Sequence, residues 1–259
     1  MEAAQPPAQP PTQSPVPQKR IDPGRVISET FEVYGHNFAP LVGMGLVVFL
    51  VVGIVSGLLD SAENWFLSLL ASVIRLAGTA IYTGFVVKLV QDTRDGKRDF
   101  AIGDLFSAAM PAVGALIING ILWGFGVGIG LVLLIVPGLI LMTIWAVAQP
   151  AIVVEGRGPV ETFGRSRELV RGEGWSVFGT IVLVWLILLA AVLITVFLGL
   201  ALGVVGVIIL GIILSALATP VFAVAVSVLF FDLGGGQGAA AAAPAAPAQQ
   251  PPPPAAPTA

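Results

Sequence analysis

Long uncharged runs dominate the hydrophobic pattern of this chain. Residues 38–59 carry no charge, and residues 65–88, which end on a lysine, are interrupted only by Arg75. Two further runs, residues 106–154 and 175–231, are entirely uncharged. An α-helix rises about 1.5 Å per residue and the hydrocarbon core of a bilayer is about 30 Å thick, so about 20 apolar residues make one crossing. The two longer runs therefore exceed a single crossing.

Each longer run is predicted to turn back on itself. In the first, residues 136–138 (VPG) are the predicted turn, because proline interrupts the helical hydrogen-bond ladder and glycine permits a reversal. In the second, the glycine-rich residues 199–206 are the predicted turn. The pattern predicts an all-α integral membrane protein with six transmembrane helices in three hairpins: 38–59, 65–88, 112–134, 139–154 and two helices within 175–231.

The positions of lysine and arginine set the orientation of these spans. Cytoplasmic loops of membrane proteins are enriched in both residues. Here they cluster before the first span, after the second and after the fourth, while the alternate loops contain none. Six spans with both termini in the cytoplasm satisfy the rule at every loop. The clusters are Lys19, Arg20 and Arg25; Lys88, Arg94, Lys97 and Arg98; and Arg157, Arg165, Arg167 and Arg171.

A short cytoplasmic interfacial helix is predicted before each hairpin. Similar tripeptides, ETF at residues 29–31 and 161–163 and DLF at 104–106, precede the three odd-numbered spans. The first of these helices has Asp22 as its N-cap, followed by a proline at its first position. Its apolar residues recur at helical spacing and predict one stripe in contact with apolar surroundings: Ile27, Phe31, Tyr34 and Phe38.

Composition supports a membrane domain flanked by two tails. Hydrophobic residues make up 56% of the chain and its mean hydropathy is +0.96, which lies outside the usual range of soluble domains. Residues 1–21 are rich in proline and glutamine and residues 234–259 in alanine and proline, so both are predicted to be disordered cytoplasmic tails. The membrane domain is then expected to occupy residues 22–233.

The chain offers little for catalysis. It has no cysteine and a single histidine, which excludes disulfides, thiol chemistry and any site that needs two histidines. Its sequence contains no phosphate-binding loop, serine-hydrolase motif or metalloprotease motif, and its carboxylates lie almost wholly outside the spans. We therefore expect no enzyme activity, no cofactor, no metal site and no nucleic-acid partner.

A charged segment after the fourth span predicts a surface helix over residues 159–171. Three apolar residues share one sector of it, and Arg165 lies opposite them between two glutamates. We expect Arg167 and Arg171, beside the apolar sector, to contact anionic phospholipid headgroups or a phosphorylated ligand together with Arg157. General anchoring at the membrane surface is the alternative that the sequence leaves open. The apolar residues are Val160, Phe163 and Val170, and the glutamates are Glu161 and Glu168.

Three polar residues interrupt the spans. Arg75 lies inside the second span, Asn119 in the third and Gln149 in the fourth. An ionisable residue within a membrane marks a functional site or an orienting contact, and amides often hydrogen-bond between helices. The sequence leaves open whether these residues hold the helices together or line a substrate path.

One segment carries a specific set of motifs. It contains PG at residues 137–138, Pro150 followed by EG at 155–156, the charged helix, and LVRG at 169–172 before Trp175. Together with the opening stretch ISETFEVYGHNFAPLVG, these motifs resemble the membrane domain of the glycerophosphoryl diester phosphodiesterase family across residues 26–233. The resemblance implies a six-helix module of the bacterial inner membrane. The catalytic activity of that family resides in a separate barrel domain, for which this chain has no room, and is not expected here.

The expected function is that of a non-enzymatic scaffold or accessory module in the bacterial plasma membrane. Its expected partners are the lipid bilayer, with anionic phospholipid at the arginines, and a second copy of the chain or another membrane protein. Glycines at four-residue spacing permit the close helix contacts that such association needs. The alternative is a small transporter or lipid-handling membrane protein, which helices kinked at Pro150 and Pro220 would suit.

Overall fold

The computed structural model describes residues 21–62, 64–96 and 101–236. This part of the chain is all-helical, with 87% helix and no strand. Most of the predicted tails, residues 1–21 and 234–259, lies outside the described residues. The α-helices are α1 (Pro23–His36), α2 (Phe38–Asp60), α3 (Trp65–Arg94), α4 (Ile102–Ala109), α5 (Val113–Leu133), α6 (Ile135–Ile144), α7 (Ala148–Glu155), α8 (Glu161–Val170), α9 (Gly174–Ala201) and α10 (Gly203–Asp232), and a short 3-10 helix, η1 (Met110–Ala112), joins α4 to α5.

Several of these helices are long and apolar enough to cross a membrane. Leu217–Asp232, within α10, is a shorter apolar helix. The chain is therefore a helical, multi-pass membrane protein, as the hydrophobic pattern predicts. Five segments in the described part have the length and composition of a membrane span: Phe38–Asp60, Trp65–Arg94, Ile102–Leu133, Ile135–Glu155 and Gly174–Ala201.

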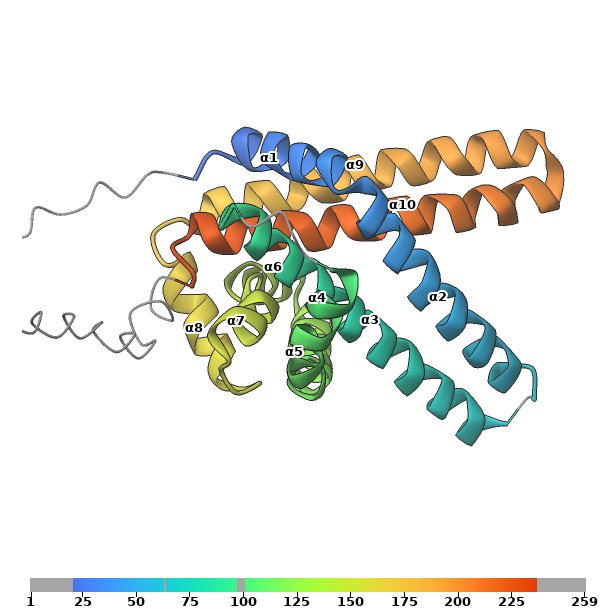
Figure 1. The fold of residues 1–259 in the computed structure, drawn as a ribbon, viewed down its shortest axis with the longest axis horizontal. Coiled ribbons are helices and arrows are strands. Elements are labelled where there is room, and N and C mark those ends of the chain that lie inside the picture. The colour runs from blue at the N-terminus through green and yellow to red at the C-terminus, as the bar shows by residue number, and fades with distance from the viewer. Residues whose placement is uncertain (1–20, 63, 97–100, 237–259) are drawn as a thin grey trace, which may run out of the picture.

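Successive long helices pack along one another: α2 with α3, α5 with α6, and α9 with α10. In Figure 1 the pairs α2–α3 and α9–α10 come together beside α1 and diverge toward their far ends. Far from the core the side chains are apolar and exposed, as at Leu58, Trp65 and Phe197, so they are available to lipid. The core lies where the pairs converge, and its largest buried side chains include Leu41, Tyr82, Phe85, Leu89, Leu229 and Phe230.

Local capping explains where several helices begin. Asp22 Oδ1 accepts a hydrogen bond from the backbone N–H of Gly24 at 2.9 Å, which confirms the predicted start of α1. Asn64 Oδ1 accepts from the N–H of Phe66 at 2.9 Å in the same way at the start of α3.

Between α9 and α10, Gly203 has a φ of 76°, a conformation that favours glycine. The turn predicted within residues 199–206 is therefore confirmed.

The turn between α5 and α6 differs from the one predicted at residues 136–138. The chain reverses at Leu134, whose backbone is extended (φ −158°, ψ 132°). Pro137 lies instead in the first turn of α6, where its missing N–H breaks no helical hydrogen bond and its fixed φ suits the helix. The reversal brings Gly130 against Gly138, so that a Cβ on Gly130 would lie 2.9 Å from the Cα of Gly138.

Helix α1 packs against α9 and α10, and only part of its predicted apolar stripe takes part in this contact. The buried residues of α1 are Val26, Thr30 and Val33. The predicted stripe includes Phe31 and Phe38, which are exposed. Tyr34 of the same stripe packs against the core, and its hydroxyl donates to the carbonyl oxygen of Leu217 in α10 at 3.2 Å. Only the exposed part of the stripe is therefore available to contact lipid.

We predict that Gly130→Ala destabilises the protein and that Gly128→Ala does not. A methyl group at residue 130 would meet the backbone of α6, and overpacking of this kind costs about 1 to 3 kcal/mol. The same methyl at residue 128 would meet nothing within 4 Å among the described atoms. Thermal unfolding in one detergent measures the difference, and equal melting temperatures for the two variants would contradict the close approach of α5 and α6.

Candidate functional site

The fourth predicted span is interrupted near its middle. Helix α6 ends at Ile144 and α7 begins at Ala148, with a turn between them. The backbone N–H of Val147 in this turn donates to Ser166 Oγ of α8 at 3.2 Å. Pro150, in the first turn of α7, has no N–H to satisfy. Irregular backbone within a membrane protein needs such partners because lipid offers none, so α8 completes the broken span.

Helix α8 packs on this break mainly through small polar residues. Its buried residues are Thr162, Ser166 and Val170. The three apolar residues assigned to one sector do not share one environment, because Val170 is buried whereas Val160 is 65% exposed. Small side chains let α8 approach the turn closely, and their hydroxyl groups supply hydrogen bonds that purely apolar side chains cannot.

Asn119 ties α5 to the same helix. Its Nδ2 donates to the carbonyl oxygen of Pro159 at 2.8 Å and to Thr162 Oγ1 at 3.1 Å. These bonds fix the amide orientation, since a flip would place Oδ1 against the Pro159 carbonyl. The side chain is fully buried, and Oδ1 has no hydrogen-bond partner among the described residues. The contacts make Asn119 a link between helices, which is one of the two roles left open by the sequence.

A buried carboxylate that the sequence analysis missed lies at the end of α7. The Glu155 side chain is 5% exposed and accepts hydrogen bonds from Nε and Nη2 of Arg165 at 3.0–3.2 Å. It also accepts from Arg157 Nε at 2.8 Å and from the backbone N–H of Gly236 at 3.2 Å. The hydrogen bonds to Glu155 raise the pKa of Arg165, so this guanidinium stays charged. Glu155 therefore joins α7, α8 and the segment that follows α10.

The sequence gives only a weak indication that Glu155 pairs with a cation. Gly156 ends α7 with a φ of 64°, so the carboxylate sits at the negative end of the helix dipole and needs a cation nearby. Helical spacing pairs Arg165 with Glu161 and Glu168. In the described part of the chain its ion pairs are with Glu155 and, at 3.6 Å, with Glu168. Helical spacing cannot foresee a partner that lies ten residues back, on another helix.

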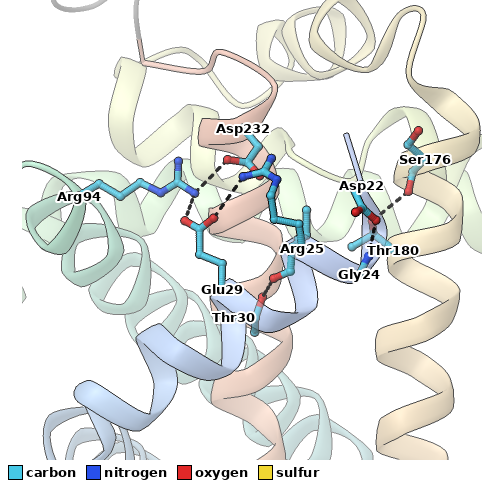
Figure 2. Close-up of polar contacts among 10 residues, drawn as sticks. Asp22, Gly24, Arg25, Glu29, Thr30, Arg94, Ser176, Thr180 and Asp232 are labelled. Carbon is cyan, nitrogen blue, oxygen red and sulfur yellow. Dashed lines mark hydrogen bonds and ion pairs between the residues drawn. The ribbon is translucent and has the colours of Figure 1, made fainter. Parts of the chain in front are cut away.

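A second ion cluster joins α1, α3 and α10 (Figure 2). The side chain of Asp232, the last residue of α10, is 7% exposed and accepts hydrogen bonds from Arg25 Nη2 at 2.7 Å and from Arg94 Nη2 at 3.0 Å. Both arginines also pair with Glu29 of α1, and the guanidinium of Arg94 lies 5.4 Å from the centre of the Phe231 ring. Because this carboxylate also ends a helix, its arginines offset the helix dipole as well as the charge.

The three arginines predicted to contact lipid headgroups differ in whether they form ion pairs within the protein. Arg157 is paired with Glu155. Arg167 and Arg171 are exposed, and neither has an ion-pair partner within the residues that the structure describes. Trp175, which is 87% exposed, follows Arg171 by four residues. Two guanidinium groups and an indole are therefore free to contact the surroundings at this end of α8.

The three polar residues within the spans do not come together. Arg75 Nη1 pairs with Asp60 Oδ2 at 2.7 Å, so its side chain reaches toward the end of α2 and is 47% exposed. Asn119 contacts α8, as described above. Gln149 lines a cavity of about 220 Å³ between α3, α7 and α10. Arg75 thus serves the contact between α2 and α3, and of the three residues Gln149 faces open space.

Residues 66–198 match a family described as a domain of unknown function, DUF7847. The match covers 133 of the 259 residues. The chain belongs to the DUF7847 family. No curated protein and no solved structure matches it. The DUF7847 region contains the broken span, α8 and the Glu155 carboxylate, whereas α1, α2 and the Asp232 carboxylate lie outside it.

We predict that Glu155→Gln destabilises the DUF7847 region by about 3 kcal/mol, because it leaves the guanidinium of Arg165 without its main counter-charge. Arg165→Met alone should have a similar effect, since it leaves the carboxylate unpaired. The double variant should lose less than the sum of the two, because neither charge is then left alone. Chemical unfolding in one detergent measures all three variants. Strictly additive free energies of unfolding would show that Glu155 and Arg165 act independently.

Proposed function

We propose that this protein is a non-enzymatic multipass module of the bacterial inner membrane, a scaffold or accessory protein that contacts anionic phospholipid headgroups through Arg167 and Arg171. In this proposal six spans form three hairpins, each preceded by a short cytoplasmic helix: α1, α4 and α8. Helix α10 supplies the sixth span, and both termini face the cytoplasm. The observation that carries the headgroup contact is the division of the arginines on and around α8.

The arginines on and around α8 differ in their partners. One carboxylate binds two of them, and the other two have no carboxylate partner among the described residues. Glu155 pairs with both Arg157 and Arg165. At about 100° per residue, Arg167 and Arg171 project from one side of the segment, roughly opposite the buried side of α8. Guanidinium groups match phosphate oxygens bidentately, and anionic lipids attract exposed basic residues beside a membrane domain. Arg167 on α8 and Arg171 directly after it, both without an ion-pair partner among the described residues, therefore suit a lipid phosphate.

Neighbouring apolar residues support an interfacial position for this surface. Val160 and Trp175, both largely exposed, flank the two arginines along the chain. Tryptophan is enriched at the boundary between membrane and water. The exposed Phe31 of α1 and the exposed Phe38 at the start of α2 suit the same boundary. These side chains favour placing α1 and α8 at the headgroup level of one leaflet.

The resemblance to the membrane domain of the glycerophosphoryl diester phosphodiesterase family supports the same architecture. The motifs behind it now have structural positions: PG at 137–138 in the first turn of α6, EG at 155–156 at the end of α7, and LVRG at 169–172 at the end of α8. All three lie at helix ends, so the proposal adopts the membrane module and no phosphodiesterase activity.

A small transporter or lipid-handling protein is the second candidate. The broken fourth span and the cavity beside Gln149 favour it, because discontinuous helices line the substrate sites of many transporters. Arg75 and Asn119 lie outside the cavity lining and have partners of their own. The polar path that a transporter needs therefore has less support than the headgroup contact.

We expect the purified protein to retain anionic lipid, and the Arg167→Ala/Arg171→Ala variant to lose it. The protein would be placed in nanodiscs with equal amounts of phosphatidylglycerol and phosphatidylcholine. Native mass spectrometry then counts the lipids that stay bound after release from the disc. Each basic residue near an anionic surface contributes about 1 kcal/mol, so the ratio of bound phosphatidylglycerol to phosphatidylcholine should fall several-fold.

Two further variants separate this contact from general effects of charge. Arg167→Lys/Arg171→Lys keeps both charges and should keep part of the preference, since lysine cannot bind phosphate bidentately. Arg75→Ala removes a charge that is paired with Asp60, far from α8 in the sequence, and should leave the lipid ratio unchanged. An unchanged ratio in the double alanine variant would refute the headgroup contact.

The six-span arrangement predicts a labelling pattern for single cysteines, which the cysteine-free sequence makes simple to introduce. Ser61, Gly164 and Leu202 are exposed and lie between the proposed spans. In intact cells a membrane-impermeant maleimide should label Ser61→Cys and Leu202→Cys. It should label Gly164→Cys only after lysis, because the basic loops face the cytoplasm. Labelling of Gly164→Cys in intact cells would contradict the arrangement.

A further inference from the structure

We propose that the cavity between α3, α7 and α10 binds the hydroxyl-bearing end of an uncharged, single-chain lipid. Gln149 and Thr83 provide the hydrogen bonds, and the acyl chain extends into the bilayer. The site involves neither Arg167 nor Arg171 and does not depend on the headgroup contact proposed above.

The cavity lies where helices far apart in the sequence meet. Helix α3 contributes Thr79 and Thr83 to its lining, α7 contributes Gln149, and α10 contributes Thr219 and Ser227. Gln149 is the second residue of α7, so the turn between α6 and α7 sets its position. The break that α8 stabilises thus also positions an amide in the interior of the membrane domain.

Two polar groups in the lining are free to bind a ligand. The amide of Gln149 and the hydroxyl of Thr83 have no hydrogen-bond partner within the described part of the chain, and both side chains are partly exposed. An amide without a hydrogen-bond partner is unfavourable in apolar surroundings. By contrast, three other hydroxyls of the lining already donate to backbone carbonyls at 2.7–3.1 Å: Thr79 to Arg75, Tyr82 to Leu41 and Ser227 to Ala223.

The charges around the cavity specify a neutral ligand. Among the described residues no charged side chain lines it, and Arg75, one turn from Thr79 on α3, is paired with Asp60. An ionised ligand would therefore lack a counter-charge in low-dielectric surroundings. Gln149 offers two donors and an acceptor, and Thr83 offers a donor and acceptor lone pairs. A hydroxyl group, which both donates and accepts, matches this set.

The size and opening of the cavity suit a lipid that has a single acyl chain. At about 30 Å³ per water molecule, a volume of about 220 Å³ holds about seven waters, or the polar end of a small lipid. Thr79 and Phe222, which is 37% exposed, lie at the edge of the cavity, so it opens toward the lipid-facing surface of the helices. A monoacylglycerol fits these limits, with its glycerol inside and its chain leaving past Phe222.

Photo-crosslinking of the full-length protein in nanodiscs tests the site directly. The probe is a monoacylglycerol that carries a diazirine beside its glycerol end. Peptide mass spectrometry should place the crosslinks at residues 79–87, 149–150 and 219–227, which line the cavity. Excess monoolein should compete with the probe, and phosphatidylglycerol should not. Crosslinks confined to other parts of the protein would overturn the proposal, and this result requires no variant.

Near-isosteric variants identify the groups responsible. Gln149→Met/Thr83→Val should reduce labelling several-fold, whereas Thr143→Val should not. Thr143 is the matched control because its hydroxyl donates to Leu139 of its own helix and lies outside this cavity. Arg167→Ala/Arg171→Ala should label like the unmodified protein, which separates this site from the headgroup contact. Equal labelling of the unmodified protein and the Gln149→Met/Thr83→Val variant would overturn the proposal.

Discussion

Backbone polar groups inside a bilayer must find their partners within the protein, and the broken fourth span is where this constraint shapes the molecule most. The turn between α6 and α7 frees the N–H of Val147, which only a neighbouring segment can satisfy. Helix α8 supplies Ser166, so it must stay close to the break. Asn119 and the Glu155 carboxylate hold α8 there from two other sides. A short charged helix is thereby held against the membrane domain by hydrogen bonds and an ion pair.

A second constraint, that buried carboxylates need counter-charges, divides six of the arginines into two groups. Four of them, Arg25, Arg94, Arg157 and Arg165, bind two buried carboxylates that each end a helix. Such carboxylates would be unfavourable beside the helix dipole without these cations. The remaining pair near α8, Arg167 and Arg171, has no structural partner among the described residues and is free for lipid. Freedom from a carboxylate, more than position on a helix, is what distinguishes a candidate ligand contact here.

The sequence predicts the features that depend on residues close to one another along the chain. The length of the uncharged runs locates the long helices, Asp22 marks the start of α1, and the glycines around Gly203 mark a turn. The reversal at Leu134 escapes prediction because a proline suits a turn and the first turn of a helix equally well. The ion clusters escape it because their partners are distant along the chain, as Arg25 and Asp232 are, at 207 positions apart. Gln149 stands out in an apolar run, but Thr83 becomes notable only once the helices around it are placed.

Because the long helices diverge away from the core, the folded state of this protein includes the lipid around it. Beyond the converging ends, α2 and α9 carry many exposed apolar side chains, and few residues of these two spans are buried within the protein. Acyl chains must fill that space, so lipid replaces there the interior that a soluble protein builds from its own residues. Bilayer thickness and lateral pressure then become structural variables of this molecule, and the angle between its helix pairs is a property of the protein and the membrane together.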